Sequence, residues 1–250
     1  MPMDYSWIIK TDIAHRGLYK SGTKYEENSL AAIERAVEKG YAIEIDVRMT
    51  AEGAIVVFHD ARLERLTDGR GYVSEFTYAE LEKYTVGQTG LKIPLLTDVL
   101  DLVNERVPLI IEAKCPLSMD PFQLCAGIRF ALEGYIGKIA VMSFNPKVAL
   151  WFRDNFPDYA RGLVIDFQGL SKFHRRLLTS YSLRRTNPHF LALDINSLPS
   201  KFAEKWRSSD KPLLTWTVKS KGQETVAREN ADALIFEAPA VAGTLDDGTP

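Results

Sequence analysis

The strongest constraint on the fold is an alternation of short apolar runs and amphipathic segments along the whole chain. The apolar runs predict strands over residues 12–15, 42–47, 54–59, 108–114, 139–144, 161–165, 190–195, 213–218 and 233–237. Helical spacing of apolar residues predicts helices over residues 29–39, 97–104, 122–133, 146–155, 199–208 and 222–229. Strands that alternate with helices pair in parallel through right-handed crossovers, so we expect an α/β protein.

Several predicted strands are apolar along their whole length, as strands covered on both faces are. Such units, repeated through 250 residues, predict a TIM-type (β/α)8 barrel formed by residues 1–250 as a single domain. Nine predicted strands are one more than this barrel holds, so one of them should be peripheral. Residues 60–96 interrupt the alternation with turn signals, and they predict a small insertion on the third strand-to-helix loop that partly covers the barrel mouth.

Composition excludes several classes of protein. The 31 basic and 33 acidic residues give a net charge of −2, which argues against a nucleic-acid partner. Two cysteines, Cys115 and Cys125, provide no disulfide framework and indicate a reducing compartment. The first apolar run is too short for a signal peptide, and no stretch approaches the roughly 18 apolar residues of a membrane span. We therefore expect a cytoplasmic protein without a membrane span; the sequence selects no oligomeric state.

Three carboxylates interrupt otherwise apolar strands. Glu44 and Asp46 are two residues apart, so both should point to the same face of one strand. Glu112 occupies a similar position near the end of the fourth predicted strand, where Lys114 should face the same way. Buried carboxylates repel each other unless a proton or a cation neutralises them. Oxygen ligands suit hard divalent ions, so these residues predict a site for Mg²⁺ or Ca²⁺.

Two histidines and two cations stand at the same predicted edge. His15 and His59 end strands and can give or take protons near neutral pH. Arg16 offers a planar fork suited to phosphate, and Lys114 offers a compact positive charge. Arg16 can share a site with His15 only if the strand has already ended, which Gly17 permits. A metal, two proton carriers and two cations together predict cleavage of a phosphate ester.

At this point the sequence resembles the glycerophosphodiester phosphodiesterase family. The resemblance extends over almost the whole chain and is carried by these motifs: His15-Arg16-Gly17, Glu26-Glu27-Asn28-Ser29, Glu44-x-Asp46-Val47, His59-Asp60, Leu63-x-Arg65-x-Thr67-Asp68-Gly69-x-Gly71, Glu112-x-Lys114, Ser143-Phe144 and Trp216-Thr217-Val218. It implies hydrolysis of glycerophosphodiesters to sn-glycerol 3-phosphate and an alcohol. In this family the neighbouring glycerol hydroxyl often attacks phosphorus, and water then opens the cyclic phosphate.

The resemblance also implies a role for each candidate residue. Glu44, Asp46 and Glu112 would bind the divalent metal, His15 and His59 would be the acid and base, and Arg16 and Lys114 would hold the phosphate. Trp216 would form a wall for the glycerol or the alcohol. The chain departs from the family pattern at Glu26, at Lys219 and at Phe236-Glu237. These departures concern substrate recognition, because Lys219 could reach a more anionic head group.

Three alternatives remain at this stage. A sphingomyelinase-D-like enzyme would use a similar site and release a cyclic phosphate, but such enzymes are usually secreted and disulfide-bonded. A Schiff-base lyase or aldolase would use Lys114 at the end of its buried strand. A non-catalytic phosphodiester-binding protein would keep the pocket without turnover.

Overall fold

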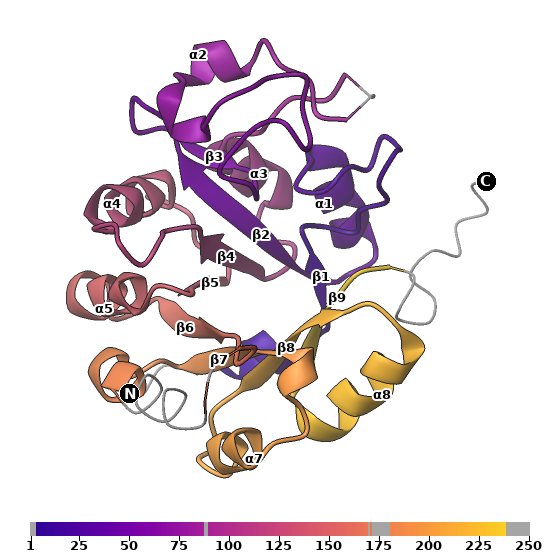
Figure 1. Cartoon of the computed structure of the whole chain (residues 1–250), viewed down its shortest axis with the longest axis vertical. Coiled ribbons are helices and arrows are strands. Elements are labelled where there is room, and N and C mark those ends of the chain that lie inside the picture. The colour runs from indigo at the N-terminus through magenta and orange to yellow at the C-terminus, as the bar shows by residue number, and fades with distance from the viewer. Residues whose placement is uncertain (1–3, 88–89, 170, 172–180, 239–250) are drawn as a thin grey trace.

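All nine predicted strands are present in the computed structural model, which describes residues 4–87, 90–169, 171 and 181–238. The strands are β1 (Ile13–His15), β2 (Ala42–Met49), β3 (Ile55–Val57), β4 (Leu109–Ala113), β5 (Ile139–Ser143), β6 (Ala160–Ile165), β7 (Phe190–Asp194), β8 (Leu213–Val218) and β9 (Ala233–Phe236). They form one sheet in the order β1-β9-β8-β7-β6-β5-β4-β2-β3, and an additional pairing joins β1 to β2. That pairing closes a parallel barrel from every strand except β3 (Figure 1).

The peripheral strand is β3, which pairs with β2 in the antiparallel direction. Only a tight turn joins the two strands, with the Thr50 N–H donating to the Ala54 carbonyl at 2.9 Å. A parallel pair would need a crossover of about a dozen residues, so this connection forces antiparallel pairing. The predicted position of the insertion is corrected accordingly: residues 60–96 follow the third strand of the chain but the second strand of the barrel.

The six predicted helices are present within a few residues of their expected ends. The helices in the described residues are α1 (Leu30–Glu38), α2 (Tyr78–Leu81), α3 (Leu96–Val103), α4 (Phe122–Ala131), α5 (Pro146–Asn155), α7 (Lys201–Arg207) and α8 (Lys221–Asn230). The short helix α2 is additional to the six. Ser29 caps α1, since its Oγ accepts a hydrogen bond from the Ala32 N–H at 3.2 Å. None of the helices in the described part of the chain has the length and hydropathy of a transmembrane span.

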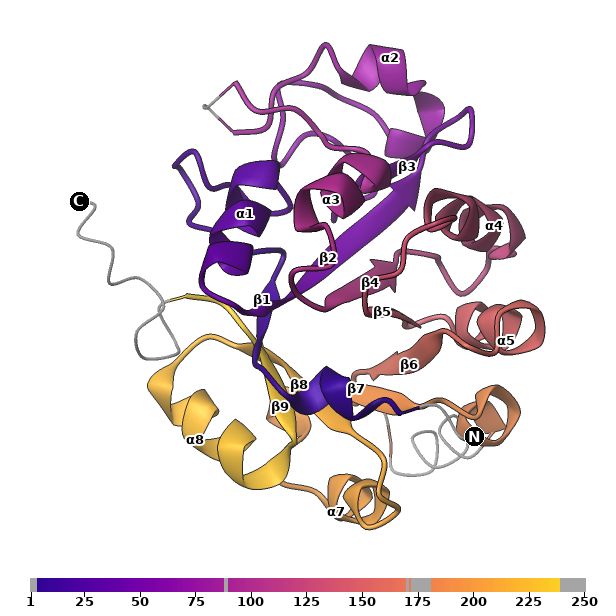
Figure 2. The ribbon, with the colours of Figure 1, turned by 180° about the vertical axis from the view of Figure 1, so that it is seen from behind.

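The barrel interior is filled by apolar side chains near the amino ends of its strands. Ile13, Ala42 and Ile110 belong to this cluster, together with Ile8 of the 3-10 helix η1 (Ser6–Ile9). In Figure 2 the indigo turn of η1 lies across the rear end of the barrel. A larger apolar cluster packs the outside of the barrel against the helices. Interior side chains alternate along each strand, so the next inward positions after Ile13, Ala42 and Ile110 face the barrel mouth.

The insertion has a small apolar cluster of its own. Its buried members are Val56, Phe58, Leu63, Val73, Leu81, Val86 and Ile93. The 3-10 helix η2 (Val73–Glu75) and α2 belong to this segment. The cluster includes β3 residues that pair with β2, so the insertion is fixed to the barrel at one end and extends above it in Figure 1.

Candidate active site

Strand register brings the predicted residues together at the barrel mouth. His15 of β1 is the register partner of Glu44 of β2, and Asp46 of β2 is the partner of Glu112 of β4. Partner residues of parallel strands share one face of the sheet, so all four side chains project into the same space. They occupy the inward positions directly above the apolar interior. This part of the predicted site follows from spacing of two within the strands and from the closure of the barrel.

The three carboxylates are buried, and their charges interact strongly. Burial raises the pKa of Glu44 well above its ordinary value, and the charges of Asp46 and Glu112 add to the shift. Burial alone would also raise the pKa of Asp46, but the positive charges of Lys114 and Arg16 outweigh it and lower that pKa. Burial likewise raises the pKa of Glu112, although Lys114 opposes the shift. Lys114 and Arg16 therefore neutralise only part of the negative charge of the three carboxylates.

The geometry of the carboxylates suits a divalent cation. Glu44, Asp46 and Glu112 each offer an oxygen atom, and these atoms lie within 4.8 Å of one another. Glu44 Oε1 and Asp46 Oδ1 are buried without a hydrogen-bond partner among the described residues. A buried acceptor without a donor is costly, and a hard cation with oxygen ligands would satisfy Glu44 Oε1 and would also lie beside Asp46 Oδ1, whose nearest cation is Lys114. These residues therefore fit the predicted metal.

Lys114 and Arg16 lie against the same carboxylates. Lys114 Nζ is 2.8 Å from Asp46 Oδ1, as an ion pair without hydrogen-bond geometry, and 2.6 Å from Glu112 Oε1. Arg16 Nε lies 3.1 Å from Asp46 Oδ2, while its Nη1 donates to Glu27 Oε1 at 2.7 Å. Burial lowers the pKa of each cation, but the surrounding carboxylates outweigh it and raise both pKa values. Both residues are therefore cationic beside the cluster.

The end of β1 allows His15 and Arg16 to face one site, as predicted. The strand ends at His15, and Arg16 adopts a positive φ of 56°. Gly17 has a φ of 79°, and a Cβ there would lie 2.8 Å from the Ala32 carbonyl carbon. The turn also directs the Arg16 N–H toward Glu44 Oε2 at 3.1 Å.

His15 is held by a carboxylate from the far end of the chain. Its Nδ1 lies 2.9 Å from Glu237 Oε1, and its Nε2 is 3.8 Å from Glu44 Oε2. A glutamate on Nδ1 favours the tautomer that carries its proton there, which leaves Nε2 facing the carboxylates. Burial lowers the pKa of His15, although the Glu237 contact opposes the shift. Sequence reasoning named Glu237 only as a departure from the family pattern, without this role.

His59 reaches the site because β3 runs back toward it. The Phe58 N–H donates to the Asp46 carbonyl at 2.9 Å, which places the next residue level with the carboxylates. His59 Nδ1 lies 2.6 Å from Asp60 Oδ1, and Arg48 donates to the His59 carbonyl. Burial lowers the pKa of His59, although the Asp46 charge opposes the shift. The predicted position at a strand end is confirmed, but the strand is the antiparallel one.

A network on the insertion connects the orienting carboxylates. Arg65 donates to both oxygens of Glu27 at 2.9 and 2.8 Å, and to both oxygens of Asp60 at 2.5 and 3.0 Å. Glu27 holds Arg16, and Asp60 holds His59. The quoted family motifs contained these residues, but they gave no sign that the residues meet.

Asn28 fixes Asp46 from the loop before α1. Its Nδ2 donates to Asp46 Oδ2 at 2.9 Å, and its Oδ1 accepts the Asp46 N–H at 3.2 Å. Asn28 adopts a positive φ of 60°, a conformation that asparagine tolerates better than most residues. Sequence reasoning named Asn28 only as part of a family motif and missed this contact.

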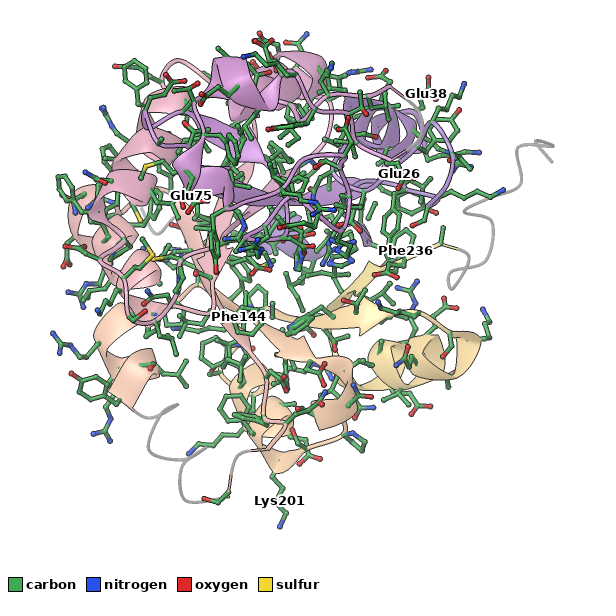
Figure 3. The ribbon with its side chains drawn as sticks, turned by 45° about the horizontal axis from the view of Figure 1, so that its top comes forward. Glu26, Glu38, Glu75, Phe144, Lys201 and Phe236 are labelled. Atoms are coloured by element: carbon green, nitrogen blue, oxygen red, sulfur yellow. The ribbon has the colours of Figure 1, made fainter. Side chains whose placement is uncertain are left out.

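Trp216 and Lys219 lie on the β8 side of the site. Trp216 Nε1 donates to the Ala192 carbonyl at 3.0 Å, and its ring meets Phe144 edge-on with centroids 5.4 Å apart. Phe144 is labelled near the middle of the barrel mouth in Figure 3. Lys219 Nζ lies 3.0 Å from Glu237 Oε1, so it joins the site through the partner of His15. Burial would raise the pKa of Glu237, but hydrogen bonds from His15 and Lys219 lower it to about 2.

The barrel and its mouth together define an enzyme that cleaves phosphoric diesters. A sequence model of the glycerophosphoryl diester phosphodiesterase family matches residues 15–241. A glycerophosphodiester phosphodiesterase of Caldanaerobacter subterraneus subsp. tengcongensis is 30% identical over 238 residues, which cover 91% of this chain and 93% of the relative. The chain belongs to the glycerophosphoryl diester phosphodiesterase family.

Solved structures support the same fold. An Oleispira antarctica phosphodiesterase in complex with the product sn-glycerol 3-phosphate superposes with a TM-score of 0.78 at 23% identity, covering 91% of this chain and 93% of that chain. A glycerophosphodiester phosphodiesterase from Thermotoga maritima gives a TM-score of 0.73 at 22% identity, covering 90% of this chain and 94% of that chain. At these identities the likeness establishes the TIM-type barrel alone.

Proposed function

We propose that this protein hydrolyses glycerophosphodiesters to sn-glycerol 3-phosphate and an alcohol in a reaction that requires a divalent metal. The observation that carries the proposal is the buried cluster of Glu44, Asp46 and Glu112, in which Glu44 Oε1 has no hydrogen-bond partner among the described residues, with histidines and cations on its rim. The relatives' names and the product bound to the Oleispira enzyme support the choice of substrate.

The three carboxylates would hold Mg²⁺ or Ca²⁺. Such an ion would supply positive charge that stabilises the negative charge developed on the phosphoryl group in the transition state. Arg16 and Lys114 add two further positive charges in the same buried space, so both would bind and orient the phosphate. Their present contacts with Asp46 and Glu112 place both head groups beside the cluster.

His15 and His59 would move the protons. Each has Nδ1 held by a carboxylate, Glu237 for His15 and Asp60 for His59, which leaves Nε2 for the substrate. One Nε2 would accept the proton of the attacking hydroxyl, and the other would donate a proton to the departing alcohol oxygen. Burial lowers the pKa of both imidazoles, which favours the neutral ring that the base needs. The histidine that acts as the acid must carry a second proton on Nε2, and the nearby Asp46 charge favours that form of either ring.

Trp216 and Lys219 would contact the organic part of the substrate. Trp216 and Phe144 form an aromatic corner beside the site, and Lys219, whose side chain is 58% exposed, adds a positive charge.

We also propose that residues 1–250 form one catalytic domain, because β3 pairs with β2 of the barrel and also packs in the apolar cluster of the insertion. Free thiols at Cys115 and Cys125 support a reducing compartment such as the cytoplasm.

The proposal is tested by release of glycerol 3-phosphate from a panel of glycerophosphodiesters. The panel contains choline, ethanolamine, inositol and glycerol esters, each assayed with EDTA and after addition of Mg²⁺ or Ca²⁺. We expect release that EDTA abolishes and a divalent ion restores. Binding of the esters that raises the melting temperature without release would show a binding protein instead.

A further inference from the structure

A groove of about 280 Å³ lies between the insertion and the start of α4. The end of β2 forms its floor, the segment around η2 forms one wall, and the segment from β4 to α4 forms the other. Most of its surface is contributed by apolar side chains: Met49, Tyr72, Val73, Pro116, Met119 and Leu124. The roles proposed for the catalytic residues do not account for the apolar lining of this groove.

One end of the groove is continuous with the candidate active site. Lys114 lines the groove, and its Nζ is 2.8 Å from Asp46 Oδ1 and 2.6 Å from Glu112 Oε1. Arg48 also lines the groove while it donates to the His59 carbonyl at 2.9 and 2.7 Å. A phosphate beside Lys114 would therefore have one of its two ester arms directed toward the groove.

The walls do not suit a polyol or a cation. Glycerol hydroxyls need hydrogen-bond partners, and besides Asp120 and the two cations the described residues of the walls offer only Ser74, Gln123 and the Tyr72 hydroxyl among mostly apolar surface. Asp120 is the only carboxylate among the described residues that line the groove, and its Oδ1 already accepts the Phe122 N–H at 3.0 Å. Polar partners for glycerol lie on the opposite side, where Glu237 and Lys219 meet.

The outer rim is also apolar. Met119 is 54% exposed, and the neighbouring Leu117 and Phe122 are 66% and 60% exposed. Tyr72, on the facing wall, is 45% exposed. Exposed large apolar side chains that line a groove, as Met119 and Tyr72 do, are typical of a surface that binds an apolar ligand.

We propose that this groove is the subsite for the departing alcohol and that it selects an alcohol with an unbranched apolar chain. The assignment rests on the proposed phosphodiesterase function. The phosphate lies beside Lys114, the glycerol arm lies toward Glu237 and Lys219, and the apolar chain of the alcohol lies along Met119 and Val73.

The test uses the metal-loaded full-length protein and the ethyl, butyl and hexyl esters of glycerol 3-phosphate, with the choline ester for comparison. Release of glycerol 3-phosphate gives kcat/KM for each. We expect kcat/KM to rise about two- to fourfold for each added methylene, since a fully buried methylene corresponds to about fourfold. A hexyl ether on the terminal glycerol hydroxyl of the ethyl ester, which leaves the hydroxyl next to the phosphate free, should give no such gain when release of ethanol is measured.

Met119→Glu places a charge on the wall and should lower the ratio of hexyl to ethyl kcat/KM. Phe130→Glu is the control, because Phe130 is 74% exposed on α4, the helix that follows Met119, and does not line the groove. This control should keep the parent ratio. Equal kcat/KM for all alkyl esters, a gain from the glycerol-side ether, or a parent ratio in Met119→Glu would overturn the groove assignment alone. Absence of release from every ester, choline included, would overturn the phosphodiesterase function itself.

Discussion

Replacing Arg65 with lysine should reduce turnover far more than stability. Arg65 joins Glu27, which holds Arg16, to Asp60, which holds His59. Lysine keeps the positive charge, but it cannot make two bidentate contacts at once. Both orienting carboxylates would therefore lose part of their support while the net charge of the site stays the same.

The size of each effect follows from the exposure and contacts of Arg65. Its side chain is 46% exposed, so its ion pairs should contribute about 1 kcal/mol or less to the free energy of unfolding. Loss of a residue that orients active groups typically costs about 10- to 100-fold in activity. We expect kcat to fall by that factor because His59 is less well oriented. KM should rise because Arg16 loses the fixed position of Glu27.

Steady-state release of glycerol 3-phosphate measures kcat and KM, and urea unfolding measures stability. Arg62→Lys is the matched control, because Arg62 makes a similar fork to Glu64 on the same insertion and its side chain is 51% exposed. This control should keep the parent kcat. A parent kcat in Arg65→Lys, or equal losses in both variants, would refute the positioning role.

Three further predictions concern the site and the core. His15→Ala and His59→Ala should each lower kcat by about 10²- to 10⁴-fold with an unchanged circular dichroism spectrum, and near-parent rates would remove the acid and base assignment. Asp46→Asn should weaken Mg²⁺ or Ca²⁺ binding in calorimetry, whereas an unchanged affinity would contradict the metal site. Gly162→Ala should destabilise the protein by about 1–3 kcal/mol in urea unfolding, because overpacking strains a core. The added Cβ would overlap the ring of Phe190, so an unchanged midpoint would contradict this packing.

Much of the barrel was predictable from local pattern. Fully apolar strands and amphipathic helices recur in an order that allows parallel pairing, and every predicted strand is present. The sequence analysis did not predict which strand is peripheral, although the short connection from Met49 to Gly53 determines it. A connection without room for a helix permits only an antiparallel return, and that return carries His59 to Asp46.

The candidate site, like the barrel, was predictable only in part. Spacing of two along β2 predicted that Glu44 and Asp46 face together, and the register of β4 adds Glu112. Contacts such as His15 with Glu237 join residues 222 positions apart, and they exist only because β9 closes the barrel beside β1. The local sequence pattern carries no information on such side-chain pairs. The contact of Glu237 with His15 and the contacts of Arg65 with Glu27 and Asp60 were therefore found only in the structure.

The most direct test of the central claim is phosphorus NMR of glycerophosphoethanolamine incubated with the protein after EDTA treatment and after restoration of Mg²⁺ or Ca²⁺. The account predicts that the diester resonance converts to that of sn-glycerol 3-phosphate only when the ion is restored, and that His59→Ala leaves the diester unchanged. An unaltered diester with folded, metal-loaded protein would contradict phosphodiesterase activity. A cyclic phosphate that accumulates and is not opened would contradict hydrolysis and show a lyase.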